Sequence, residues 1–197
     1  GQLELEEVVT GLRRPSKGRI MLIGKDVTGL DTGRIKDRGV AYIPSDRLKR
    51  GMVDSLSLAR NSVLGVHRCA DFSRRGALLE NAVREHAQTI VAKYDVRAES
   101  IDQPMGSLSG GNQQKMLVGR ELARPHSIVI AAQPTRGLDV GATHYIREQI
   151  LSSRNTGKAV LLISAELDEV FELSDRLAVI YEGRIVDVRP TSQFTER

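Results

Sequence analysis

The chain has 197 residues, of which 40% are hydrophobic and 27% are charged, a composition typical of a globular protein and not of a disordered one. The formal net charge is +4, but the basic residues are spread along the chain, and aromatic residues make up only 4%. Both observations argue against a nucleic-acid partner. No apolar run approaches the ~18 residues that span a bilayer. The single cysteine, Cys69, excludes an internal disulfide and favours a reducing compartment.

The first part of the chain predicts one helix and two strands. Apolar residues recur at helical spacing from Leu5 to Leu12, with Gly11 as a cap. Because this pattern starts almost at the first residue, we expect further sequence upstream of Gly1. Residues 19–23 predict a strand followed by a turn at 24–26, and residues 39–43 predict a buried strand that ends at Pro44.

The rest of the chain predicts a helical segment and then a second α/β segment. From about residue 56 to 94 the pattern is helical, without a convincing strand. Helices are then predicted over 112–123, 142–153 and 167–173, between strands at 128–131, 159–164, 177–181 and 184–187. Apolar strands that alternate with amphipathic helices indicate a parallel sheet covered on both faces. We therefore predict an α/β core over residues 1–54 and 108–197, with a helical subdomain over 55–107.

The segment at 108–115 reads Leu-Ser-Gly-Gly-Asn-Gln-Gln-Lys and opens a helix that ends before Pro125. Ser109 is placed as the N-cap, and Gly110 and Gly111 leave backbone N–H groups accessible to a ligand. Because the positive end of the helix dipole lies there, a bound anion is favoured. On these residues alone, an ordinary capped helix is an alternative that stays open.

These eight residues resemble the signature of ATP-binding-cassette (ABC) ATPases, in the variant found in importers of sugars and nucleosides. Other segments resemble the family's motifs in the same order: a Q-loop region at 41–47, a Walker B strand that runs into a D-loop with Gly137, Leu138 and Asp139, and a switch region at 163–170. The resemblance covers essentially the whole chain. It is closest to the second nucleotide-binding half of a tandem ATPase, and it implies a P-loop-NTPase-like α/β fold with a helical subdomain.

Where the family has catalytic residues, this chain has others. The positions of the Walker B aspartate and the catalytic glutamate are Ala132 and Gln133. A methyl group cannot bind Mg²⁺, and an amide cannot accept a proton at neutral pH. The switch-histidine position is Ala165, and the Q-loop glutamine position is Ser45. We therefore expect this half, by itself, not to hydrolyse ATP.

The sequence contains no Gly-x-x-x-x-Gly-Lys-Ser/Thr motif, which forms the phosphate-binding P-loop. The resemblance places Gly1 and Gln2 at the end of that loop. It thus implies that the chain is truncated before the Walker A loop and lacks the strand that carries it. We expect an incomplete parallel sheet with an open edge, prone to pairing with a neighbouring chain.

The resemblance also implies partners and a nucleotide. Ser109, Gly110, Gly111 and Gln113 would contact, in trans, ATP with Mg²⁺ that is held mainly by the first half of the same polypeptide. The D-loop residue Asp139 would lie at that interface, although capping of the following helix is an equal alternative. Transmembrane permease subunits would meet residues 45–52 and the helical subdomain, and a substrate-binding protein would act indirectly. The implied location is the cytoplasmic face of a bacterial-type cell membrane.

The choice between sugar and nucleoside stays open at this point. Two other functions also stay open. One is an ABC-related factor that acts on ribosomes or DNA without transport, although the helical insertion is short. The other is a regulatory domain that binds no nucleotide. The four histidines show no metal-ligand spacing, so no metal site is predicted within the chain.

Overall fold

The structure is a computed structural model that describes residues 1–194, and it divides into two compact units. The first unit contains residues 1–42, 126–133 and the chain from 150 onward. The second contains residues 43–125 and 134–149. The second unit therefore groups the predicted helical subdomain, residues 55–107, with residues 43–54, 108–125 and 134–149 of the predicted α/β core.

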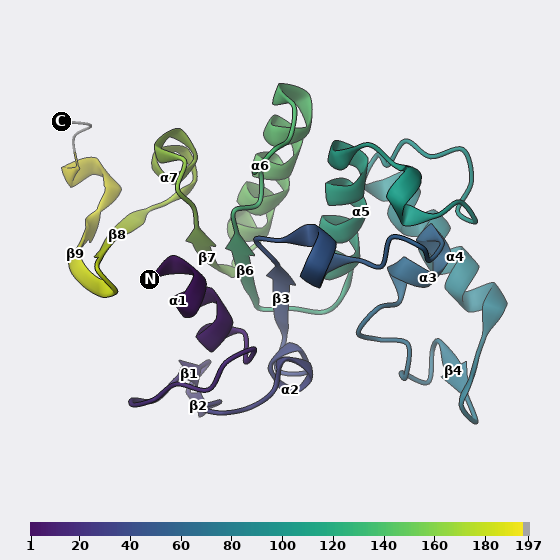
Figure 1. The fold of residues 1–197 in the computed structure, drawn as a ribbon, viewed down its shortest axis with the longest axis horizontal. Coiled ribbons are helices and arrows are strands. Elements are labelled where there is room, and N and C mark those ends of the chain that lie inside the picture. Colours follow the sequence, from purple (N-terminus) through teal and green to yellow (C-terminus); the bar gives the residue numbers. More distant parts are fainter. Residues whose placement is uncertain (195–197) are drawn as a thin grey trace. The chain divides into compact units, whose positions relative to one another are not determined.

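The first unit is built on a three-stranded sheet in the order β3-β6-β7 (Figure 1). Its strands are β3 (Val40–Ile43), β6 (Ile128–Ala132) and β7 (Ala159–Ile163). β6 and β7 run parallel, with Ile128 opposite Ala159 and Ala132 opposite Ile163. All of β3 and most of β6 are buried, as expected for apolar strands covered on both faces. The helices of this unit are α1 (Gln2–Val9), α2 (Thr32–Lys36), α7 (Leu167–Leu173), the end of α6 (Val140–Asn155) and the short η3 (Thr191–Gln193).

A buried polar pair joins α1 to the central sheet. The Glu6 side chain is 1% exposed, and the Tyr42 hydroxyl donates a hydrogen bond to its Oε1 at 2.5 Å. Ile35, Val40 and Ile130 pack with the Tyr42 ring in one apolar cluster. Burial of each such side chain contributes roughly 1.5–3 kcal/mol. The carboxylate of Glu6 is tolerated in this core because it accepts this hydrogen bond.

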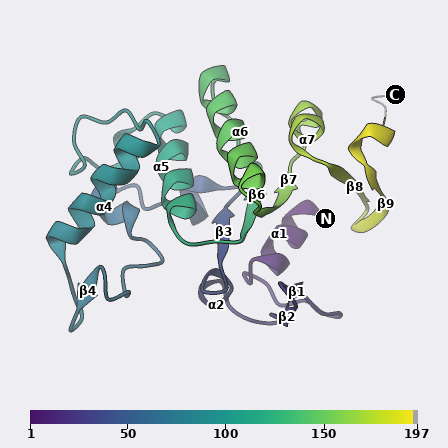
Figure 2. The same ribbon diagram turned by 180° about the vertical axis from the view of Figure 1, so that it is seen from behind.

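β7 lies at an edge of the three-stranded sheet. Strands β8 (Arg176–Tyr181) and β9 (Arg184–Pro190) pair only with each other, as an antiparallel hairpin beyond α7 (Figure 2). A cleft of about 470 Å³ has residues 158–164 on one side and residues 176–178 on the other. The predicted open edge is therefore confirmed. The expectation that residues 177–181 and 184–187 join the parallel sheet is wrong.

Three hairpins share one turn chemistry that the sequence analysis missed. Their two turn residues, Ile23-Gly24, Arg75-Gly76 and Glu182-Gly183, all have positive φ. Such turns match the right-handed twist of the strands that they join. They connect β1 (Met21–Leu22) to β2 (Lys25–Asp26), β4 (Ser73–Arg74) to β5 (Ala77–Leu78), and β8 to β9. Residues 25–26 are thus a strand and not a turn, and the helical insertion contains a small hairpin.

The second unit is mainly helical. Its elements are η1 (a π-helical turn, Arg47–Gly51), α3 (Leu58–Ser62), α4 (Glu80–Lys93), η2 (Met105–Ser107), α5 (Gly110–Ala123) and the first part of α6. α4 packs closely on α5 at Gly119, where an added Cβ would lie 2.8 Å from both Ile90 and the Tyr94 ring. This packing explains why α5 belongs to the helical unit and not to the sheet.

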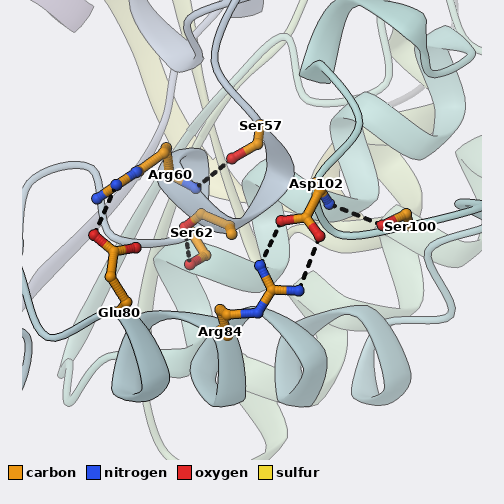
Figure 3. A network of polar contacts seen from close by, with 8 residues as sticks. Ser57, Arg60, Ser62, Glu80, Arg84, Ser100 and Asp102 are labelled. Carbon is orange, nitrogen blue, oxygen red and sulfur yellow. Dashed lines mark hydrogen bonds and ion pairs between the residues drawn. The ribbon is translucent and has the colours of Figure 1, made fainter.

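Polar contacts fix the entry of the helical subdomain. The Asn61 side chain, 1% exposed, donates to the carbonyls of residues 53, 56 and 57 and accepts from the Val53 N–H at 2.9 Å. Figure 3 shows the neighbouring network, in which Ser57 caps α3, Arg60 contacts Glu80, and Arg84 binds Asp102 through two hydrogen bonds. These contacts tie α3, α4 and the loop at 100–103 together.

Candidate functional site

The signature turn is the N-terminus of α5. The Ser109 side chain accepts hydrogen bonds from the Asn112 backbone N–H at 3.4 Å and from its side-chain amide at 3.0 Å, which confirms the predicted N-cap. Ser109 is exposed, and Gly110 and Gly111 form the first turn of the helix. Their N–H groups have no partner inside the helix because they precede its first closed turn. The turn therefore offers backbone donors at the positive end of a 14-residue helix.

Both signature glycines also pack closely against neighbouring side chains. An added Cβ at Gly110 would lie 2.8 Å from Nη2 of Arg47. One at Gly111 would lie 3.0 Å from the Ala142 Cβ and 3.3 Å from Oδ2 of Asp139. Ligand access was the reason for these glycines that the sequence indicated, and Arg47 as a neighbour of the turn was not predicted.

Gln113 lies one turn further along α5 and is 8% exposed. Its side-chain amide donates to the Met105 carbonyl at 3.5 Å and accepts from Nε of Arg47 at 3.4 Å. Its polar atoms are thus engaged within the chain, and its contact with a nucleotide stays a prediction. The next residue, Gln114, donates to the Pro134 carbonyl at 2.7 Å and ties α5 to the segment at 134–139.

The predicted D-loop residues lead into α6. Asp139 accepts from the Ala142 N–H at 2.8 Å through Oδ1 and from the Thr143 N–H at 2.9 Å through its carbonyl. This confirms the alternative in which Asp139 caps the helix. Gly137 has φ +70, and Leu138 is half-buried. Because Asp139 also packs against Gly111, the structure brings the D-loop segment and the signature turn together.

Gln133, Gln2 and the segment after β7 form a hydrogen-bonded bridge in the first unit. Ala132 is fully buried at the end of β6, and Gln133 follows with φ +45, a left-handed conformation that is unusual for a residue other than glycine. The Gln133 amide donates to Gln2 at 3.3 Å and accepts from the Ala165 N–H at 3.4 Å. Gln2 in turn donates to the Ser164 carbonyl at 3.1 Å. The bridge joins the end of β6, the start of α1 and the segment after β7.

These residues do not fit a magnesium ion. Ala132 and Ala165 each present a methyl group, and Gln133 presents an amide whose oxygen accepts a hydrogen bond. Mg²⁺, in contrast, is bound by carboxylate oxygens, phosphates and water. Across residues 1–194 there is no group of three or more His, Cys, Asp or Glu side chains that could hold a metal ion. Ser45 lies just after β3 and belongs to the second unit. None of the helices described is both long and apolar enough to cross a membrane.

A parallel β/α sheet, together with a helical unit in which α5 opens with a capped Ser-Gly-Gly turn, defines the fold of an ATP-binding cassette. A dimeric cassette solved with ADP and phosphate, MJ0796, superposes with a TM-score of 0.77 at 19% identity and covers 97% of this chain and 81% of its own. The chain belongs to the ABC transporter family, whose model matches residues 4–136.

The chain also resembles curated import proteins. It is 43% identical over 197 residues to the guanosine import ATP-binding protein NupO of Bacillus subtilis. It is 42% identical over 200 residues to the glucose import ATP-binding protein TsgD13 of Haloferax volcanii. Both alignments span the whole chain, which covers 39% of the length of the first relative and 36% of the second.

Proposed function

We propose that this chain is the second nucleotide-binding half of the ATP-binding subunit of an ABC importer for nucleosides or simple sugars. Its role is to donate the signature turn at Ser109, Gly110 and Gly111 to ATP with Mg²⁺ that is held mainly by the first half. The observation that carries this proposal is a contrast within the chain. The signature turn is capped and ordered for an anion, while the chain's own magnesium and base positions are Ala132 and Gln133.

The relatives support both the solute class and the arrangement in halves. One is named for guanosine import and another for glucose import, at nearly equal identity. A chain that spans about two fifths of such proteins matches the size of one half of a tandem polypeptide. The proposal includes the first half, permease subunits that contact residues 45–52 and the helical subdomain, a substrate-binding protein, and a location on the cytoplasmic face of the membrane.

The chemistry requires little more from this half than positioned donors. Phosphoryl transfer is catalysed mainly by alignment and by stabilisation of charge on the phosphate oxygens. Backbone N–H groups held at a helix N-terminus provide such stabilisation without reorganisation during the reaction. Asp139 contributes by capping α6 beside Gly111, which holds the D-loop segment against the signature turn. Gln113 is the fourth residue that we propose to serve this nucleotide.

The test is a substitution of Ser109→Arg in the complete importer, made from the full-length polypeptide, its permease subunits and its binding protein. The arginine side chain fills the space in front of the turn that the phosphates need. We expect ATP turnover to fall about 100-fold or more, comparable to the loss of a transition-state donor. Ser152→Arg, at an exposed position of α6 outside the proposed permease contact, makes the same change of side chain away from the turn and serves as the control.

Turnover that survives Ser109→Arg at the level of the Ser152→Arg control contradicts the proposal, provided that both variants melt at the temperature of the unaltered protein. Co-purification of the full-length protein with ribosomes or DNA, in place of permease subunits, also contradicts it and favours the non-transport factor.

A further inference from the structure

The π-helical turn η1 lies along one face of α5. Arg47, at its start, contacts Gly110 and Gln113, and Gly51, at its end, contacts Leu117. Positions 110, 113 and 117 follow helical spacing and share one face of α5. We call this contact between η1 and α5 the η1–α5 seam. π-Helical turns are rare and often occur at functional sites.

Gly51 fixes the far end of the seam. An added Cβ there would clash with Cδ1 of the buried Leu117 and lie 3.3 Å from Cγ of Pro44. The backbone of η1 at Gly51 therefore packs directly on the Leu117 side chain of α5. At the near end, the Asp46 side chain accepts from the Lys49 N–H at 3.0 Å and caps the turn.

Arg47 joins the seam to the D-loop segment. Its Nε donates to Oε1 of Gln113 at 3.4 Å, and its Nη1 donates to the Arg136 carbonyl at 3.4 Å. Its Nη2 packs against Gly110, at the place that a side chain would otherwise occupy. The planar guanidinium presents several donors in a fixed fork, so one side chain holds three segments at once. A lysine, with one nitrogen, cannot reproduce this arrangement.

We infer that Arg47 is a positioning residue that holds the signature turn in register with the segment at 134–139. It acts through Gly110, Gln113 and the Arg136 carbonyl, and it makes η1 the element that sets the position of Ser109–Gly111. This inference rests on the proposed function, in which the turn serves a nucleotide and residues 45–52 face the permease.

The test compares Arg47→Ala and Arg47→Lys with Lys17→Ala in the full-length protein assembled with its permease. Lys17 is the control because it is an exposed cation outside residues 45–52, the helical subdomain and the signature turn. The first readout is backbone hydrogen exchange without nucleotide. We expect Arg47→Ala to speed exchange at residues 109–117 and 134–139 by about tenfold, in line with loss of hydrogen bonds to a charged group. Lys17→Ala is expected to leave exchange there unchanged.

The second readout is steady-state ATP turnover. A residue that aligns the turn acts mainly in the transition state, so kcat is expected to fall about tenfold in Arg47→Ala with KM for ATP within about twofold. Arg47→Lys is expected to recover part of kcat, since its ammonium reaches one of the acceptors. Faster exchange with unchanged kcat overturns the positioning role, and unchanged exchange overturns the seam itself. Because exchange is measured without ATP, these results differ from a failure of the proposed function, which Ser109→Arg reports.

Discussion

At two glycines of the signature turn, neighbouring side chains occupy the space that a larger residue would need. At Gly110 the space for a side chain is taken by Arg47, and at Gly111 by Ala142 and Asp139. The sequence indicated one reason for these glycines, which is access of a ligand to the backbone. It could not indicate their close packing, because packing depends on which segments meet in the fold. Close packing is thus a second reason for glycine at these two positions, beside the ligand access that the proposed function needs.

Gly119 provides the clearest test of the packing requirement. An alanine there gains up to about 1 kcal/mol of helix propensity. Its Cβ, however, would lie 2.8 Å from Ile90 and from two atoms of the Tyr94 ring in the core between α4 and α5. We expect Gly119→Ala to lower the free energy of unfolding by about 1–3 kcal/mol, as overpacked cores do, measured by urea denaturation.

Gly141→Ala is the matched control for this prediction. It also lies in a helix of the second unit, and its nearest neighbour is 3.4 Å away, which is ordinary contact. A neutral or slightly stabilising effect is expected. Equal effects of the two substitutions would contradict the packing argument.

At the scale of elements, long periodic segments could be predicted and short hairpins could not. α7 begins and ends where its apolar spacing indicated, and β3 ends at Pro44 as expected. The strands of the β1–β2 and β4–β5 hairpins have two residues each, too few to show alternation. Their signal was the turn dipeptide, Ile23-Gly24 or Arg75-Gly76, which resembles no strongly preferred hairpin turn such as Asn-Gly.

His86, on helix α4, is a partly buried histidine whose protonation affects the free energy of unfolding. His86 packs on the Phe72 ring, with ring centroids 4.8 Å apart, and its burial lowers the pKa of the imidazole, an effect that a backbone hydrogen bond to Ser62 partly opposes. Because the folded pKa lies below the ordinary value of 6.5, protonation favours the unfolded chain. This contribution to stability is complete above pH 6.5 and is lost as the pH falls through the lowered folded pKa.

We expect His86→Gln to flatten the decline in unfolding free energy between about pH 7 and pH 5, measured by denaturation at several pH values. His67→Gln, at an exposed position, is expected to leave the decline as it is. A decline that persists unchanged in His86→Gln would assign the pH dependence to other groups.

At the scale of the whole molecule, the motifs predicted the family and the degenerate positions, whereas the contacts that organise the site required the structure. Arg47 reaches residues 66 and 89 positions away, and Gln133 reaches one 131 positions away. Such pairs depend on how several elements pack, and a single sequence carries no local signal of them. The edge position of β7 agrees with the sheet expected from the family resemblance.

In the proposed function, the second unit supplies the signature turn, and the first unit supplies no catalytic base. The variants Gln133→Glu, in the first unit, and Ser109→Arg, in the second, compare these two contributions to ATP turnover. In the complete importer, Gln133→Glu places a carboxylate where the family resemblance puts the catalytic base. We expect it not to restore turnover there, because on the same resemblance Ala132 still takes the place of a magnesium ligand and Ala165 that of the switch histidine. We expect ATP turnover to stay within about twofold of the unaltered importer, while Ser109→Arg in the second unit abolishes it. The measurement is steady-state ATP hydrolysis at saturating ATP, with the melting temperature as a check on folding. A several-fold gain in Gln133→Glu would show that the first unit lacks only a base, and the division of labour between the halves would have to be redrawn.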